Sequence, residues 1–248
     1  MLGRIEKHIL TEISEHGTIH MTLIDPDKMK NINYLQIAEE ASQGGTSAIM
    51  VGGSTIASNV DIDKCVKEIK EKIDTPVILF PNGTAGITPA ADAIWFMSLL
   101  NSSNPYYLID CQALAAPVIK RYRLEAIPMA YIIIGSGGAA GYVGQARKIS
   151  YEQSELVLGY SMAAELLGIR FIYLEAGSGA KKPIPPKTIH LVNSHTNIPL
   201  IVGGGIKNPK SAVEAKKAGA NIIVTGTLIE EKNEIRNKIS EIVEAIQN

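Results

Sequence analysis

The chain has few of the residues that mark several common classes of protein. Its 248 residues include two cysteines, one tryptophan and 5% aromatic residues, and its formal net charge at pH 7 is −1. Cys65 and Cys111 form no CxxC spacing, which fits reduced thiols in a cytosol rather than a disulfide framework. The balanced charge gives no indication of nucleic-acid binding.

Long apolar runs are also missing. A membrane-spanning helix needs roughly 18 apolar residues, and no run in this chain approaches that length. The first residues, Met1 to Lys7, lack the apolar core of a signal peptide. We therefore expect a cytoplasmic protein without a transmembrane segment. Any membrane contact would be peripheral, through a lipid substrate or product or a surface patch.

Short apolar runs are abundant by contrast. With 46% hydrophobic and 20% charged residues, the chain suits a single domain over residues 1–248. Eight β-rich runs alternate with helical segments, and most are continuous in Ile, Val and Leu, as expected for strands covered on both faces. The runs are Ile19–Ile24, Ala48–Val51, Val77–Phe80, Ile94–Leu99, Tyr131–Ile134, Phe171–Leu174, Leu200–Val202 and Ile222–Val224.

This alternation predicts an α/β fold with a parallel sheet, and eight units favour closure into a TIM (β/α)8 barrel. One connection differs from the others. Residues 81–93 contain two prolines and two glycines, which leaves little room for a crossover helix. We predict that the third helix is missing or replaced by extended chain. The alternative fold is an open, doubly wound sheet.

The most informative tract runs from Tyr173 to Gly179. It combines the end of a strand, one carboxylate at Glu175 and a Gly-Ser-Gly loop. Backbone N–H groups of such a loop can hold an anion. A glutamate beside it could act as a general base on a hydroxyl, or instead form a structural ion pair with Lys181 or Lys182.

Two further glycine loops follow apolar strands, Gly203-Gly204-Gly205 and Gly226-Thr227. Loops after the seventh and eighth strands are the usual phosphate site of a TIM barrel. The three loops together therefore predict a phosphate-binding domain. The alternative to phosphate binding is that tight turns alone require these glycines. It would explain part of the glycine content of the loop after strand 7.

Strands 1 and 2 also end in polar residues. Asp25 follows the first strand, and Ser54 and Thr55 follow the second. A carboxylate on this rim can hold Mg²⁺ together with phosphate oxygens of a substrate. The alternative roles are a turn or a helix cap.

Other polar residues carry less information. The loop Gly135–Gly141 is interpreted either as a mobile cover over the site or as a flexible loop without a ligand, and we favour the second. The histidines lie away from the predicted carboxyl ends of strands, so none is expected to be catalytic or to bind a metal. They are His8, His16, His20, His190 and His195.

Taken together, the motifs closely resemble the geranylgeranylglyceryl phosphate synthase family. The segments that carry the resemblance are Leu23–Lys28, Tyr173–Gly179, Val202–Ile206 and Gly226-Thr227. The resemblance implies a barrel without a regular third helix. It also implies a Mg²⁺-dependent prenyltransferase that joins sn-glycerol 1-phosphate to geranylgeranyl diphosphate, the first ether-bond step of archaeal membrane lipids.

The resemblance also assigns residues. Asp25 and Ser54 match the metal positions, with Thr55 as a rival to Ser54. Glu175 matches the proposed base, and Tyr173 is expected either to orient the substrate or to fill the barrel. The expected glycerol-phosphate site comprises Tyr173, Leu174, Glu175, Ala176, Gly177, Ser178, Gly179, Gly204, Gly205, Gly226 and Thr227.

Three alternative functions remain open at this stage. One is a synthase that uses a longer prenyl diphosphate, such as a heptaprenyl type. A second is a sugar-phosphate isomerase, although strand 5 ends in Ile134-Gly135-Ser136 without an acid. The third is a non-catalytic sensor of phosphorylated metabolites. A homo-oligomer is expected because most soluble assemblies are symmetric homo-oligomers.

Overall fold

The computed structural model describes residues 2–26, 33–52, 61–226 and 234–248. In these ranges eight parallel strands close into a barrel, with β1 paired to both β2 and β8. The predicted TIM barrel is confirmed, and the open sheet is wrong. The strands are β1 (Ile19–Ile24), β2 (Ala48–Val51), β3 (Val77–Leu79), β4 (Ala93–Leu99), β5 (Glu125–Ile133), β6 (Phe171–Glu175), β7 (Leu200–Gly203) and β8 (Ile222–Thr225).

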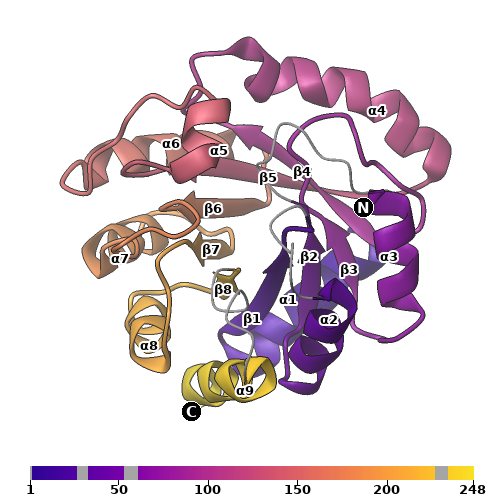
Figure 1. Ribbon diagram of the computed structural model, residues 1–248. Helices are drawn as coiled ribbons and strands as arrows, with labels where there is room; N and C mark the ends of the chain where they lie inside the picture. Colours follow the sequence, from indigo (N-terminus) through magenta and orange to yellow (C-terminus); the bar gives the residue numbers. More distant parts are fainter. Residues whose placement is uncertain (1, 27–32, 53–60, 227–233) are drawn as a thin grey trace.

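Helices surround the barrel (Figure 1). Residues 80–92 between β3 and β4 are all described and contain no helix, which confirms the predicted gap. The strand β5 begins at Glu125 rather than at the predicted Tyr131. The helices are α1 (Arg4–His16), α2 (Tyr34–Gln43), α3 (Ile62–Lys70), the π-helix η1 (Tyr106–Asp110), α4 (Cys111–Tyr122), α5 (Gly138–Val143), α6 (Ser154–Leu166), α7 (Pro186–Asn193), α8 (Pro209–Lys217) and α9 (Ile235–Gln247).

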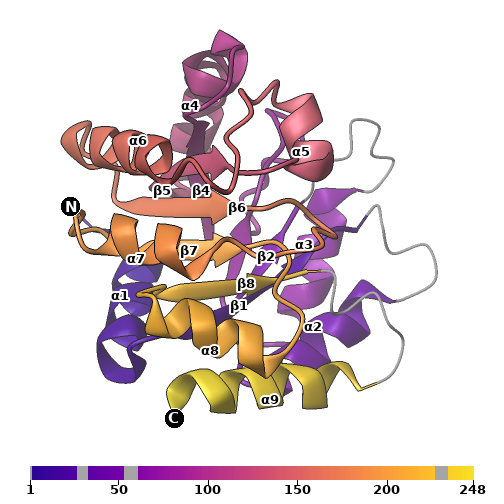
Figure 2. The same cartoon turned by 90° about the vertical axis from the view of Figure 1, so that its left-hand side faces the viewer.

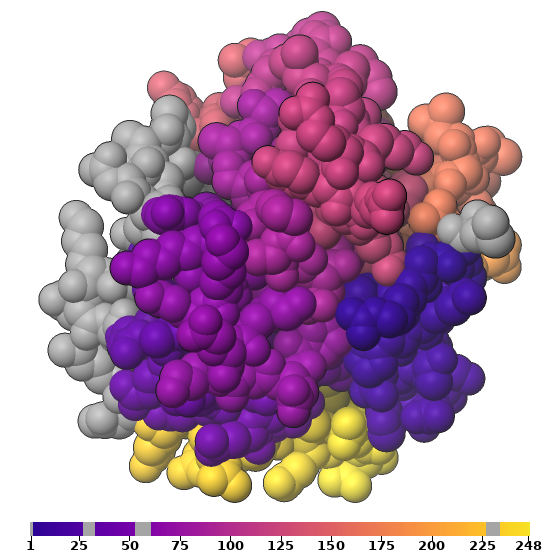
Figure 3. Space-filling model, turned by 90° about the vertical axis from the view of Figure 1, so that its right-hand side faces the viewer, coloured from indigo at the N-terminus to yellow at the C-terminus, as the bar shows by residue number. Residues whose placement is uncertain are grey.

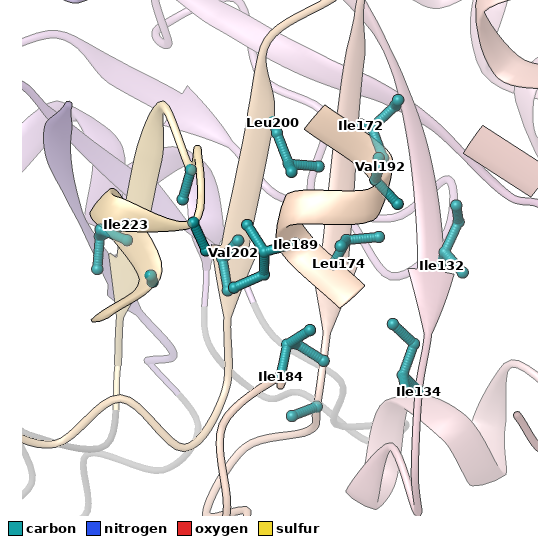
Figure 4. Close-up of a cluster of buried hydrophobic side chains, with 14 of the residues drawn as sticks. Ile132, Ile134, Ile172, Leu174, Ile184, Ile189, Val192, Leu200, Val202 and Ile223 are labelled. Atoms are coloured by element: carbon teal, nitrogen blue, oxygen red, sulfur yellow. The ribbon is translucent and has the colours of Figure 1, made fainter. Parts of the chain in front are cut away.

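Most strand residues are buried on both faces of the sheet, and the half-buried ones lie on β1, β4 and β5. On β6, Phe171 and Tyr173 join the cluster inside the barrel. Ile172 and Leu174 point outward and pack with residues of α7 (Figure 4). Full burial of such a side chain contributes roughly 1.5–3 kcal/mol of transfer free energy. This double burial explains why the strands appear in the sequence as continuous apolar runs.

The helix α1 covers the end of the barrel where the strands begin (Figure 2). The carboxylate of Glu125, at the start of β5, accepts hydrogen bonds from the backbone N–H groups of Ile5 (2.9 Å) and Glu6 (2.8 Å). These donors have no partner within the helix. The buried Glu6 carboxylate pairs with Arg170 just before β6. The space-filling view shows the indigo N-terminal segment against the magenta and pink segments (Figure 3). Chemistry is therefore expected at the opposite end.

Candidate active site

The carboxyl ends of the strands face the same end of the barrel, away from α1 (Figure 2). Two hollows lie at this mouth. One is small and lined by the glycine loops, and we name it the anion pocket. The other is larger and mainly apolar, and we name it the groove. Both are lined by Glu175, which therefore lies where the two hollows meet.

Glu175 is the last residue of β6 and is 6% exposed. Its position follows from the two-residue period of a strand, because Phe171 and Tyr173 also point inside the barrel. The backbone N–H of Gly177 donates to Glu175 Oε1 at 2.5 Å. Strand pairing places Glu175 opposite Gly203 of β7. The carboxylate thus lies inside the mouth, beside the glycine loop of β7.

Two buried tyrosines hydrogen-bond to this carboxylate. Tyr131 on β5 and Tyr173 on β6 lie opposite one another, with ring centroids 5.1 Å apart. Burial, and then the negative charge of Glu175, raises the pKa of both phenols well above 10. Both phenols therefore keep their protons and are available as donors to the Glu175 carboxylate.

The glycine loops pack backbone against backbone. A Cβ on Gly204 would lie 2.5 Å from Glu175 Oε1 and 2.7 Å from the nitrogen of Gly177. Gly204 also has φ of +78°, which disfavours other residues. A Cβ on Gly177 would lie 2.6 Å from the carbonyl carbon of Gly137 in the β5 loop. Steric contact as well as turn geometry therefore requires glycine at these positions.

The anion pocket occupies about 440 Å³, including space open to solvent. Glycine-containing loops surround it, and Lys207 is the one cation among its described lining residues, which is suitable for a phosphate group. Lys207 was not among the predicted site residues. The pocket is lined by Leu23, Tyr173, Glu175, Ser178, Gly179, Gly204, Gly205, Ile206, Lys207, Val224, Thr225 and Gly226.

The groove is about 1260 Å³, part of it open to solvent. It extends from Asp25 and Glu175 over β3 and β4 to η1 and α4, and α4 lies above β4 and β5 in Figure 1. Because residues 80–92 form no helix, this space is available to a ligand. The apolar lining includes Phe80, Ile94, Phe96, Tyr107, Ala115, Ile119, Ala140 and Val143.

One wall of the groove is the glycine-rich segment after β5. The interpretation of Gly135–Gly141 as a loop is wrong for Gly138–Gly141, which lie in α5; this helix contributes Ala140 and Val143 to the groove. Asn101, which is fully buried, donates to the carbonyl oxygens of Ile133 and Arg147 at 2.9 Å each. Its amide thus ties both ends of this segment to the loop after β4.

Asp25 lies at the end of β1, 7% exposed, and lines the groove together with Glu175. A buried carboxylate at this position is a hard oxygen donor of the kind that Mg²⁺ takes, so it fits the predicted metal role. Ser54 and Thr55 lie outside the described residues. The cluster of Glu12, Glu15 and His16 found among the described residues is on α1, at the opposite end of the barrel.

Most of the predicted glycerol-phosphate residues meet in the anion pocket. Leu174, Ala176 and Gly177 do not line it. The side chains of Leu174 and Ala176 belong to the outer core cluster. Thr227 lies outside the described residues. The sequence did not identify Tyr131 as a site residue. The feature that could have indicated it is its position in the strand that precedes β6. A prenyl substrate implied an apolar groove, but the sequence did not identify most of its residues, because they come from many separated segments.

The fold and the two hollows define an α/β-barrel protein with adjoining sites for an anion and for an apolar chain. Low-identity structural neighbours support the fold alone. An archaeal fructose 1,6-bisphosphate aldolase, for example, has a TM-score of 0.62 at 14% identity and covers 97% of this chain and 99% of its own. A model of the PcrB family matches residues 11–246, and this chain belongs to that family.

Similar proteins carry more specific names. "Geranylgeranylglyceryl phosphate synthase" of Thermofilum pendens is 49% identical over 99% of this chain and 96% of its own length. The protein of the same name from Methanobrevibacter smithii is 47% identical over 98% of this chain and 97% of its own. A crystal structure of the Thermoplasma acidophilum synthase in complex with sn-glycerol-1-phosphate has a TM-score of 0.94 at 40% identity, covering 100% of this chain and 99% of that one. The resemblance found in the motifs is confirmed.

Proposed function

We propose that this chain is a prenyltransferase that joins sn-glycerol 1-phosphate to geranylgeranyl diphosphate, giving 3-O-geranylgeranylglyceryl phosphate and diphosphate. The observation that carries the proposal is the position of Glu175, which lines both the anion pocket and the apolar groove. A phosphate and a prenyl chain bound in the two hollows would meet at this carboxylate. The names of the relatives and the ligand of the Thermoplasma acidophilum structure support the same substrates.

The mechanism requires one proton acceptor and two fixed substrates. The glycine loops hold the phosphate, so the C3 hydroxyl of glycerol phosphate points toward Glu175. The hydroxyl oxygen attacks C1 of the allylic diphosphate as the bond from C1 to the diphosphate oxygen breaks. Glu175 takes the hydroxyl proton, and diphosphate leaves. Correct positioning alone can lower such a barrier by about 7–11 kcal/mol in favourable cases.

The residues around Glu175 support this role. Tyr131 and Tyr173 donate to the carboxylate and orient it at the mouth, where it lines both hollows. The apolar walls of the groove bind the prenyl tail and exclude water from the allylic cation. A carboxylate buried in this way keeps its orientation between turnovers.

Magnesium belongs to the proposal as well. Asp25 would hold the ion at the rim of β1, with Ser54 as the second predicted ligand. When bound, Mg²⁺ neutralises negative charge on the diphosphate. Asp25→Asn is expected to raise the Mg²⁺ concentration that gives half-maximal rate. An unchanged magnesium titration would remove Asp25 from this role.

One incubation tests the function against its rivals. The purified chain is supplied with sn-glycerol 1-phosphate, Mg²⁺ and prenyl diphosphates of increasing length, and the ether product is measured by mass spectrometry. Fastest turnover with the geranylgeranyl substrate supports the proposal. A preference for a longer chain supports the heptaprenyl alternative. No ether product with any substrate would favour an isomerase or a sensor.

The proposal includes a symmetric homo-oligomer in the cytoplasm. The exposed side of α6 supports self-association, since Leu156, Met162 and Leu166 are all at least 42% exposed. Sedimentation at several protein concentrations would test the oligomer. No helix in the described part of the chain has both the length and the apolar character needed to cross a membrane.

A further inference from the structure

A polar network is buried on the outer face of the barrel, behind the anion pocket. It joins β1, β8 and the residue that precedes β2. His20 is its centre, 1% exposed, with Nδ1 at 3.1 Å from Thr46 Oγ1 and Nε2 at 2.8 Å from Thr225 Oγ1. Thr22 Oγ1 donates to Thr46 Oγ1 at 3.2 Å. A histidine so deeply buried needs both ring nitrogens satisfied.

The neighbouring donors and acceptors favour one tautomer of His20. The hydroxyl of Thr46 has one proton, and the carbonyl oxygens of His20 and Ala48 each lie 3.2 Å away. Thr46 donates to a carbonyl and accepts from His20 Nδ1–H. Nε2 is then the bare nitrogen and accepts the hydroxyl proton of Thr225. Burial lowers the pKa of His20 from 6.5 to about 3, which keeps the ring neutral.

Thr225 is where this network reaches the anion pocket. It is the last residue of β8 and lines the pocket, and Gly226 after it lines both hollows. Backbone pairing holds Thr225 on one side only. The ladder with β1 extends to Thr225, whereas the ladder with β7 ends at Val224. The hydrogen bond between Thr225 and His20 therefore holds the end of β8, where pairing with β7 has already ended.

We propose that His20 is a positioning residue for phosphate binding, which acts by holding the Thr225 hydroxyl and so fixing Gly226 at the edge of the anion pocket. His20 touches no substrate itself. Its effect should be larger on the phosphate-bearing substrate, because Thr225 lines only the anion pocket and most of the groove comes from β3, β4, η1, α4 and α5. The inference rests on the proposed function only for the identity of the ligand, sn-glycerol 1-phosphate.

The test compares two buried threonines of the same network. Thr225→Val removes the hydroxyl next to the pocket, and Thr22→Val removes one that lies farther from it. Loss of one hydrogen bond that positions the loop is expected to raise Kd and KM for sn-glycerol 1-phosphate about 10-fold in Thr225→Val. Thr22→Val should match the wild type in Kd and in the KM for both substrates. In Thr225→Val the KM for prenyl diphosphate should rise less than the KM for sn-glycerol 1-phosphate. Thr225→Ser, which keeps the hydroxyl, should restore binding.

A second pair of variants gives an independent measurement if Thr225→Val does not fold. The amide of Gln at residue 20 reaches the position of Nε2 and can accept from Thr225, whereas the shorter Asn reaches only the position of Nδ1. His20→Gln should therefore bind sn-glycerol 1-phosphate like the wild type, and His20→Asn should bind it about as weakly as Thr225→Val.

Several results would overturn the inference. Equal Kd values for Thr225→Val and Thr22→Val would do so, as would a parallel rise in KM for both substrates, which indicates a general structural defect. Failure of the wild type to bind sn-glycerol 1-phosphate would instead overturn the proposed function. The same contrasts would then be measured with inorganic phosphate, and equal affinities in all variants would overturn the positioning role.

Discussion

The anion pocket and the groove adjoin at Glu175 but are built in different ways. The pocket is lined by the loops after β6, β7 and β8, and Gly179, Gly204, Gly205 and Gly226 contribute backbone to its wall. The groove is made of apolar side chains from the strands, from η1 and α4, and from α5. A substitution at a closely packed glycine shifts the main chain. A side chain that lines the groove can change size while the main chain stays in place. Phosphate binding should therefore be intolerant of substitution, and the apolar site should be adjustable.

The largest effect is expected at the carboxylate shared by the two regions. Glu175→Gln keeps the shape and can still accept from Gly177, but it cannot take a proton at neutral pH. General-base catalysis typically contributes about 10²–10⁴-fold, so kcat should fall by that order. Calorimetry should show nearly unchanged affinity for sn-glycerol 1-phosphate. Wild-type turnover in this variant would exclude Glu175 as the base.

The second prediction tests the rigidity of the pocket. Gly204→Ala introduces a Cβ that lies 2.5 Å from Glu175 Oε1 and forces the loops apart. Small displacements of bound groups can cost on the order of 10²-fold in rate, and a comparable loss of kcat/KM for sn-glycerol 1-phosphate is expected.

Gly168→Ala is the matched control for this substitution. Gly168 follows α6 with φ of +79°, nearly the same as the +78° of Gly204, but a Cβ there meets nothing within 4 Å. Both variants carry the backbone strain of a left-handed alanine, whereas only Gly204→Ala carries the clash. Similar kcat/KM values for the two variants would show that the steric contact has no role in phosphate binding.

The contrast between the two regions also explains what could be predicted from the sequence. The pocket is encoded in short tracts, because glycine, a carboxylate and the strand end are adjacent in the chain. The barrel was predictable because strands buried on both faces leave continuous apolar runs. The start of β5 was missed because Glu125 and Pro128 interrupt the apolar pattern, although the strand pairs with β4 from Glu125 onward.

The groove could not be predicted in the same way. Its residues are ordinary core types, and only the absent helix between β3 and β4 gives them a common open space. The segment Gly135–Gly141, which runs into α5, has three glycines with positive φ, a pattern that resembles a flexible loop. Its place is fixed by Asn101, a contact across the barrel rim that local sequence does not reveal.

The third prediction tests whether the groove is adjustable. Ala115 lines the groove from α4, whereas Ala113 on the same helix is exposed. Ala115→Phe should raise the KM for geranylgeranyl diphosphate by about 10-fold or more, since lost apolar contacts of this size have such effects. Shorter prenyl diphosphates should be less affected, and the KM for sn-glycerol 1-phosphate should not change.

Ala113→Phe provides the control for that experiment. It adds the same ring to α4 outside the groove, so the KM for every prenyl diphosphate should match the wild type. Equal KM values for Ala115→Phe and Ala113→Phe would show that the prenyl chain does not reach α4.

The last prediction concerns stability. It tests the polar network that supports the anion pocket, which the apolar groove does not share. Burial lowers the pKa of His20 from 6.5 to about 3, so the unfolded chain binds a proton between these pH values that the folded chain does not. The stability linked to this group is complete above pH 6.5 and is lost as the pH falls toward 3. The expected slope from this residue is at most about 1.4 kcal/mol per pH unit.

His20→Gln removes this titration and still accepts from Thr225. Its free energy of unfolding in urea, measured between pH 7 and pH 4, should therefore fall less steeply with acidification than that of the wild type. Other titrating groups contribute equally to both proteins and cancel in the difference. Parallel curves would mean that His20 can be protonated without unfolding, and the neutral ring assigned to the network behind the anion pocket would then be wrong.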